Sequence, residues 1–130
     1  MKIHLDTGDG RQFMIRAYEP GYLLAGENRY ERSLILTPDR IIDDWRPQYL
    51  HEVDRAAIQE LADLQPEVVL LGTGREQGFP PPHCLSALTD RGIGVECMDT
   101  GAACRTYNLL VGEGRKVVAG LLLADPRLRP

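Results

Sequence analysis

The spacing of hydrophobic positions changes near the middle of the chain. Over residues 13–45 the apolar positions form short runs separated by turn residues, a pattern typical of β-strands. From residue 54 onward, apolar runs alternate with segments whose apolar positions recur every three or four residues, as on one face of a helix. The pattern therefore predicts an α/β fold with antiparallel hairpins first and strand–helix units afterwards.

Glycine and proline delimit the N-terminal strands. The pattern predicts strands at 13–18, 22–25, 29–36 and 41–45. Turns are expected at residues 19–21, which read Glu-Pro-Gly, and at 26–28, which read Gly-Glu-Asn, because proline presets φ and glycine permits positive φ. The 33–36 run carries apolar residues on both faces, so we expect that strand to lie inside a sheet.

Helices and strands alternate in the C-terminal half. Helices are expected at 54–64, 83–91 and 100–111, and strands at 68–71, 94–98 and 115–123. Asp54 and Asp99 are expected to cap two of these helices, and Gly92 to end the helix between them. We expect one three-layer α/β domain over residues 1–130, with a central mixed β-sheet flanked by helices and a polar, frayed tail at 125–130.

Composition and charge restrict the functional classes. The 130 residues are 43% hydrophobic and carry a net charge of −4, which is typical of a soluble globular protein. Lys2 and Lys116 are the only lysines, so we expect no nucleic acid as partner. The longest strongly apolar run, 117–124, is far shorter than the ~20 residues of a membrane helix, and the N-terminus turns polar too soon for a signal peptide. We expect no membrane insertion and a cytoplasmic location.

The three cysteines suggest a reducing compartment and no metal site. Cys84, Cys97 and Cys104 are odd in number and form no Cys-x-x-Cys pair, so neither a disulfide framework nor a zinc site is expected. Cys84 near a helix start could be a reactive thiol, but a buried cysteine acting as a small hydrophobe is the simpler interpretation. We predict no cofactor.

The bend after the 68–71 strand is the first candidate site. Gly72, Thr73 and Gly74 form a Gly-x-Gly turn, but the next glycine is Gly78, one residue too late for a dinucleotide-binding fingerprint. Ligands nevertheless favour the carboxyl edges of open α/β sheets. We therefore expect this loop, with Arg75, to form the lip of a pocket.

The start of the last helix is the second candidate. Arg105 and Asn108 lie three residues apart and hence on one helix surface, where the arginine could bind a carboxylate or phosphate. Capping by Asp99 and Thr100, and an ion pair from Arg105 to Asp99 or Glu113, explain the same residues structurally. The candidate ligand-binding residues are Gly72, Thr73, Gly74, Arg75, Asp99, Thr100, Arg105 and Asn108. No Ser-His-Asp set, P-loop or His-Glu-x-x-His motif is present, so we assign no catalytic residue and favour a non-enzyme.

Three blocks of sequence resemble a known family. They are 30–38 leading to Trp45, 66–74 (PEVVLLGTG) and 98–115 (MDTGAACRTYNLLVGEGR). Together they are similar to the family called domain of unknown function 498, over residues 10–123. The family-typical positions are Gly72, Gly74, Asp99, Thr100, Ala103, Arg105, Thr106, Asn108, Glu113 and Arg115. The resemblance implies a three-layer α/β fold, no assigned enzymatic activity, and relatives that include a mitochondrial assembly factor for respiratory complex I.

Two functional hypotheses follow from these observations. The first is a non-enzymatic protein that binds another protein, as an assembly factor does, with exposed hairpin edges as candidate surfaces and self-association allowed. The second is a small-ligand or anion-binding protein, or an unrecognised enzyme, with its site at the 72–75 bend and the start of the last helix.

Overall fold

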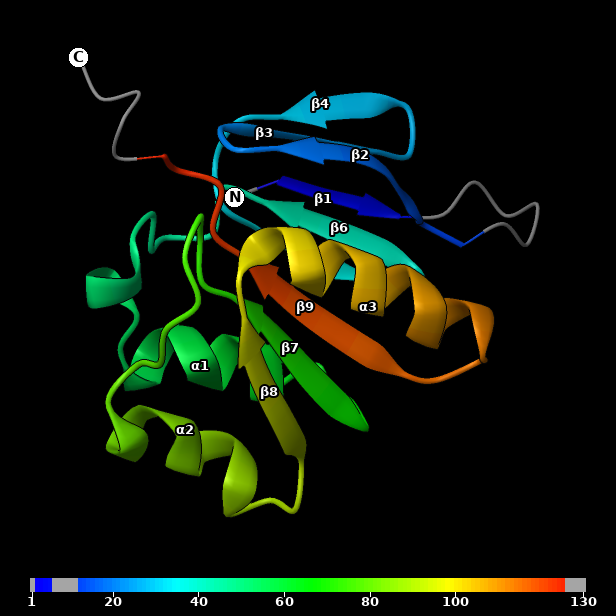
Figure 1. The fold of residues 1–130 in the computed structure, drawn as a ribbon. Helices are drawn as coiled ribbons and strands as arrows, with labels where there is room; N and C mark the ends of the chain where they lie inside the picture. The colour runs from blue at the N-terminus through cyan, green and yellow to red at the C-terminus, as the bar shows by residue number, and fades with distance from the viewer. Residues whose placement is uncertain (1, 6–11, 126–130) are drawn as a thin grey trace.

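The computed structural model describes residues 2–5 and 12–125. The strands are β1 (Lys2–Leu5), β2 (Ile15–Glu19), β3 (Tyr22–Ala25), β4 (Asn28–Tyr30), β5 (Leu34–Thr37), β6 (Arg40–Asp43), β7 (Val68–Gly72), β8 (Gly94–Met98) and β9 (Val117–Leu121). The helices are α1 (Arg55–Ala62), α2 (Pro82–Thr89) and α3 (Thr100–Gly112), with the short 3₁₀ helix η1 (Leu50–Glu52) before α1 (Figure 1). Of the predicted tail, residues 126–130 lie outside the described residues, whereas Asp125 is described and buried.

Six strands form a mixed sheet in the order β1-β6-β5-β9-β7-β8. The pairs β1–β6, β6–β5 and β5–β9 are antiparallel, and β7 is parallel to both β9 and β8. The parallel half comes from the two strand–helix units of the C-terminal half, because a helical crossover returns the chain in the same direction. The predicted central mixed sheet is confirmed.

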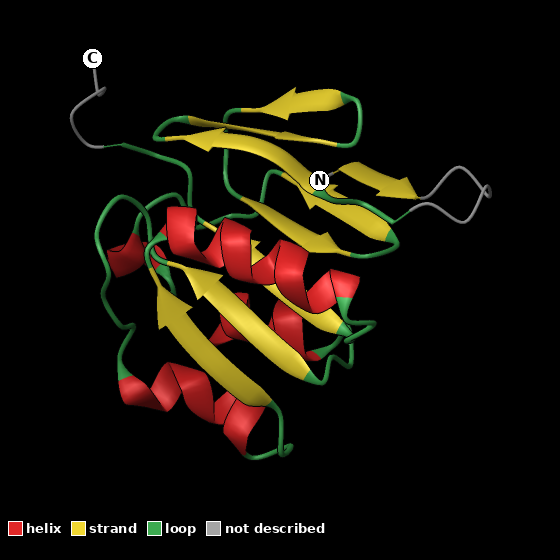
Figure 2. Cartoon of the chain, turned by 45° about the vertical axis from the view of Figure 1, so that its right-hand side comes forward, coloured by secondary structure: helices red, strands yellow, loops and turns green. Residues whose placement is uncertain are grey.

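Two apolar clusters cover the two faces of this sheet. One joins α3 and the strands β2 to β4 to alternate residues of the sheet, including Leu36, Leu70 and Ala119. The other joins α1 and α2 to the residues next to them, including Leu71 and Val118. Figures 1 and 2 show α3 on one side of the sheet and α1 with α2 on the other. The predicted three-layer arrangement is confirmed.

The predicted strand at 29–36 is wrong, because the structure divides it between two sheets. β4 pairs with β3 in a separate three-stranded antiparallel sheet, β2-β3-β4, and β5 lies inside the large sheet. The chain crosses between the two sheets over residues 31–33. There the Ser33 main chain bonds to the Gln48 side chain and the Trp45 N–H, rather than to a neighbouring strand. These contacts come from residues distant in sequence.

Local signals fixed several other boundaries. Asp54 caps α1, with Oδ1 accepting a hydrogen bond of 2.9 Å from the Ala57 N–H. β6 ends at Asp43 because Asp44 has a φ of 59°, which takes the chain out of the extended region. The helix predicted to run to residue 91 ends earlier, at Thr89, and Gly92, with a φ of 71°, lies in the turn that follows it. β1 was not predicted.

Candidate functional site

The bend after β7 packs directly against the start of α3. A Cβ atom at Gly72 would lie 3.0 Å from Thr100 Oγ1 and 3.2 Å from Thr100 Cα, so this close approach requires glycine. Gly74 has a φ of 101°, which L side chains rarely adopt. Both glycines therefore serve the path of the backbone.

Thr100 ties together three elements at this edge of the sheet. Its buried hydroxyl donates a hydrogen bond of 2.7 Å to the Leu122 carbonyl and accepts one of 2.8 Å from the Gly74 N–H. The neighbouring Asp99 caps α3, with Oδ1 accepting from the Ala102 N–H at 2.9 Å. The ends of β7 and β9 are thus fixed to the first turn of α3, and both polar side chains act as scaffold.

Thr73 organises the loop that follows. Its hydroxyl donates a hydrogen bond of 2.7 Å to the Glu76 carbonyl and accepts one of 3.2 Å from the Gly78 N–H. Its own N–H bonds to the Met98 carbonyl at the end of β8. The loop is held in one shape by its own hydroxyl and by the neighbouring strand.

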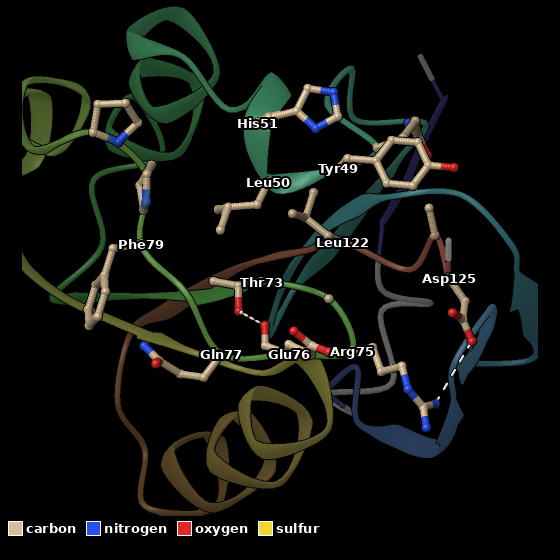
Figure 3. Close-up of a pocket in the computed structure, with 15 residues that line it drawn as sticks. Tyr49, Leu50, His51, Thr73, Arg75, Glu76, Gln77, Phe79, Leu122 and Asp125 are labelled. Carbon is tan, nitrogen blue, oxygen red and sulfur yellow. Dashed lines mark hydrogen bonds and ion pairs between the residues drawn. The ribbon is translucent and has the colours of Figure 1, made fainter. Parts of the chain in front are cut away.

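A pocket of about 650 Å³ opens beside this loop. Its walls come from residues 48–51 around η1, from 73–77 and 79–81 of the loop, and from 122 and 124–125 after β9. Figure 3 shows these side chains surrounding one space at the carboxyl ends of β7 and β9. The site therefore lies where ligand sites of open α/β sheets usually lie.

Charged groups occupy one end of the pocket. The Asp125 side chain is only 1% exposed and lies 3.9 Å from Arg75 Nη1, measured to Oδ2. The Glu76 side chain is exposed on the same loop. Burial is the main reason that the pKa of nearby Tyr18 is raised to about 12, and Cys104, Asp99 and Asp125 raise it further while Arg75 lowers it.

Aromatic side chains occupy the rest of the rim. Phe79 is 68% exposed, the most exposed large hydrophobic residue among those described. Across the pocket, the rings of Tyr49 and His51 stack with their centroids 5.8 Å apart (Figure 3). Pro80 and Pro81 follow Phe79 and join the loop to α2, so they restrict its backbone.

The structure brings part of the predicted site to the pocket. Thr73, Gly74 and Arg75 line it, as the sequence predicted for the lip of a pocket. Gly72 and Thr100 lie behind them and support the bend.

The two polar residues further along α3 do not reach the pocket lining. Arg105 is exposed and forms no ion pair with Asp99 or Glu113, nor any other within the described ranges. Asn108 bonds to both main-chain groups of Ile15, at 2.9 Å to its N–H and 2.8 Å to its carbonyl. Asn108 thus fastens α3 to β2.

The sequence patterns did not predict most of the residues that form the pocket wall. The segment 48–51 and the residues Phe79, Leu122 and Asp125 carry no motif, and only folding brings them to the loop. One signal was available, because an aromatic residue before a run of three prolines is held on a stiff loop.

The environment of Cys84 does not favour a reactive thiol. Burial raises the pKa of the Cys84 thiol and the Asp54 carboxylate adds to this, so the nucleophilic thiolate is disfavoured despite His83 Nε2 at 3.7 Å.

Residues 2–5 and 12–125 contain no group of three His, Cys, Asp or Glu placed to bind a metal ion. Over the same ranges, no helix is long and apolar enough to cross a membrane.

Comparisons with known proteins identify the family. The family model described as "Protein of unknown function (DUF498/DUF598)" matches residues 15–122. The Bos taurus protein named NADH dehydrogenase (ubiquinone) 1 alpha subcomplex assembly factor 3 is 34% identical over 104 residues, which are 78% of this chain and 55% of that protein. The Francisella tularensis protein named 13 kDa major membrane protein is 28% identical over 103 residues, 78% of this chain and 84% of that protein.

A solved structure agrees with this assignment. The crystal structure of a Bordetella parapertussis protein is 37% identical to this chain, superposes with a TM-score of 0.83, and covers 88% of this chain and 98% of its own. The chain spans about half the length of the bovine relative. The resemblance noted in the sequence is confirmed: the chain belongs to the DUF498/DUF598 family.

Proposed function

We propose that this chain is a non-enzymatic, assembly-type protein that binds another protein at the pocket beside the 73–81 loop. The observation that carries the proposal is Phe79, an aromatic side chain that is 68% exposed at the rim of an open pocket. Aromatic residues are enriched where proteins bind one another. Since the prolines after Phe79 restrict the loop, little ordering is needed when the partner binds.

Burying Phe79 at an interface would contribute a measurable part of the binding free energy. An aromatic side chain presents about 200 Å², of which roughly two thirds is open to solvent at Phe79. At about 25 cal/mol per Å², its burial contributes up to about 3 kcal/mol. Because alanine retains part of that area, Phe79→Ala should weaken binding by about 2 kcal/mol, or about 30-fold.

The relatives support a protein partner but differ in their names. The bovine relative is named an assembly factor, and that name motivates the assembly role for this chain. The Francisella relative is named a membrane protein, so the cytoplasmic location stays a prediction. The free cysteines at 84, 97 and 104 favour a reducing compartment.

The test compares two exposed apolar residues. Tagged wild-type chain, Phe79→Ala and Leu109→Ala are each used to recover partners from a lysate of the cells that naturally make the chain. Leu109 is 63% exposed on α3 and does not line the pocket, so it is a matched control. The proposal expects a reproducible partner with wild type and the control, and its loss with Phe79→Ala. Recovery that is equal for all three chains would contradict it.

A second candidate function is binding of a small ligand or anion in the same pocket. The pocket volume of about 650 Å³ lies within the range of small-molecule sites, roughly 300–1,000 Å³. Thr73, Gly74 and Arg75, which the sequence singled out, form part of its wall. A thermal-shift screen of metabolites separates the candidates, because a ligand of the native state raises the melting temperature with concentration. Such a rise, abolished by Arg75→Ala, would favour this candidate.

A further inference from the structure

We propose that the pocket binds an extended segment of the partner in which a basic residue neighbours an apolar side chain. The inference rests on the proposed function and specifies the chemistry of the partner. Three features of the pocket carry it: an apolar end, an excess of negative charge, and a row of main-chain donors without acceptors.

The apolar end determines one side chain of the segment. Leu50, Phe79, Pro80 and Leu122 are apolar residues of the pocket lining. Figure 3 shows Phe79 at the opposite end from the ion pair of Arg75 and Asp125. An aliphatic or aromatic side chain seated beside Phe79 would remove the exposed ring and the pocket wall from water together. The segment therefore carries an apolar residue at this position.

The charged groups determine the neighbouring residue. Arg75 is offset by Asp125, 3.9 Å away, which leaves Glu76 as the uncompensated charge in the pocket lining. Glu76 forms no ion pair within the described residues. A basic side chain of the segment would supply one.

The charge of the whole chain also favours a basic partner. The chain carries a net charge of −4, which favours the approach of a positively charged protein.

The loop backbone favours a peptide over an isolated apolar cation. The N–H groups of Arg75, Glu76 and Gln77 donate no hydrogen bond within the described ranges, although the N–H groups of Gly74 and Gly78 on either side do. These N–H groups have no acceptor among the described residues, so they are available to carbonyl groups of a bound peptide. An apolar cation has no acceptor atom for these N–H groups. An anion would be repelled by the Glu76 carboxylate.

The experiment selects binders without assuming a sequence. The full wild-type chain is panned against a phage-displayed library of random peptides of about 12 residues, and the enriched peptides are synthesised. Their affinities are measured by fluorescence polarisation for wild type, Phe79→Ala, Glu76→Lys and the control Glu60→Lys. Glu60 is an exposed glutamate on α1 that does not line the pocket, so it matches Glu76 in chemistry but not in place.

The inference expects peptides enriched in adjacent apolar and basic residues. Glu76→Lys should weaken their binding by about tenfold and remove most of its salt dependence, whereas Glu60→Lys should leave both unchanged. Peptides that need Phe79 but show no basic residue, or bind Glu76→Lys as well as wild type, would overturn the inference and leave the proposed function standing. Enrichment of acidic peptides would also overturn it. If no enriched peptide depends on Phe79, both the inference and the proposed surface fail.

Discussion

Replacing Thr100 by valine tests the scaffold beneath the pocket. Valine has nearly the same shape as threonine, but it lacks the hydroxyl that joins the Gly74 N–H to the Leu122 carbonyl. Thr100 is fully buried, so water cannot replace the lost partner. Each buried polar group left without a partner costs about 1–3 kcal/mol. With two such groups, the free energy of unfolding should fall by about 2–6 kcal/mol, against a total of about 5–15 kcal/mol for an ordinary domain.

The assay is equilibrium unfolding in urea, followed by the fluorescence of Trp45, the single and fully buried tryptophan. Thr106→Val is the matched control, because Thr106 lies on the same helix and its hydroxyl has no hydrogen-bond partner in the described part of the chain. The control should change stability by less than about 0.5 kcal/mol. If Thr100→Val loses no more stability than Thr106→Val, the scaffold role assigned to the Thr100 hydroxyl is refuted.

Three further perturbations have outcomes set by the structure. Gly120→Ala places a Cβ 2.9 Å from the Trp45 ring, so overpacking should cost about 1–3 kcal/mol in urea unfolding; an unchanged midpoint would contradict this packing. Asn108→Ala removes both hydrogen bonds to Ile15, and amide exchange should speed up in β2 while β8 stays unchanged. Burial raises the pKa of the Cys104 thiol to about 12. The unfolded thiol loses its proton near pH 9, so stability should be full below that pH and decline as the pH rises toward 12. Cys104→Ala should make the fall between about pH 9 and pH 12 shallower, and an equally steep fall would contradict the assignment.

Local chemistry made much of the fold predictable. Asp54 and Asp99 cap helices, Gly92 ends a turn, and the apolar run at 68–71 is a buried strand, because each signal acts within a few residues. The 29–36 run was misassigned because the crossing between the sheets, at residues 31–33, contains no glycine or proline to mark a break. That crossing depends on contacts from Gln48 and Trp45, which a local pattern does not contain.

The candidate site was predictable only where the backbone itself required particular residues. Gly72 and Gly74 mark a bend in the sequence, and ligand sites favour the carboxyl edge of a sheet. The sequence therefore pointed to the loop that contains Thr73, Gly74 and Arg75, which line the pocket. Phe79 and Asp125 were missed because the pocket exists only where three segments distant in sequence meet: 48–51, 73–81 and 122–125. Asn108 is polar in sequence, but the structure shows that its amide serves packing between α3 and β2.

The most direct test of the account is hydrogen–deuterium exchange on the chain with and without its recovered partner. We predict that binding slows exchange in the loop 73–81 and in 48–51 around η1, which form two walls of the pocket. Little change is expected on α3 around Leu109, an exposed apolar residue outside the pocket. Protection confined to α3 or to the β2-β3-β4 sheet, with the loop unprotected, would contradict the claim that this pocket is the binding surface.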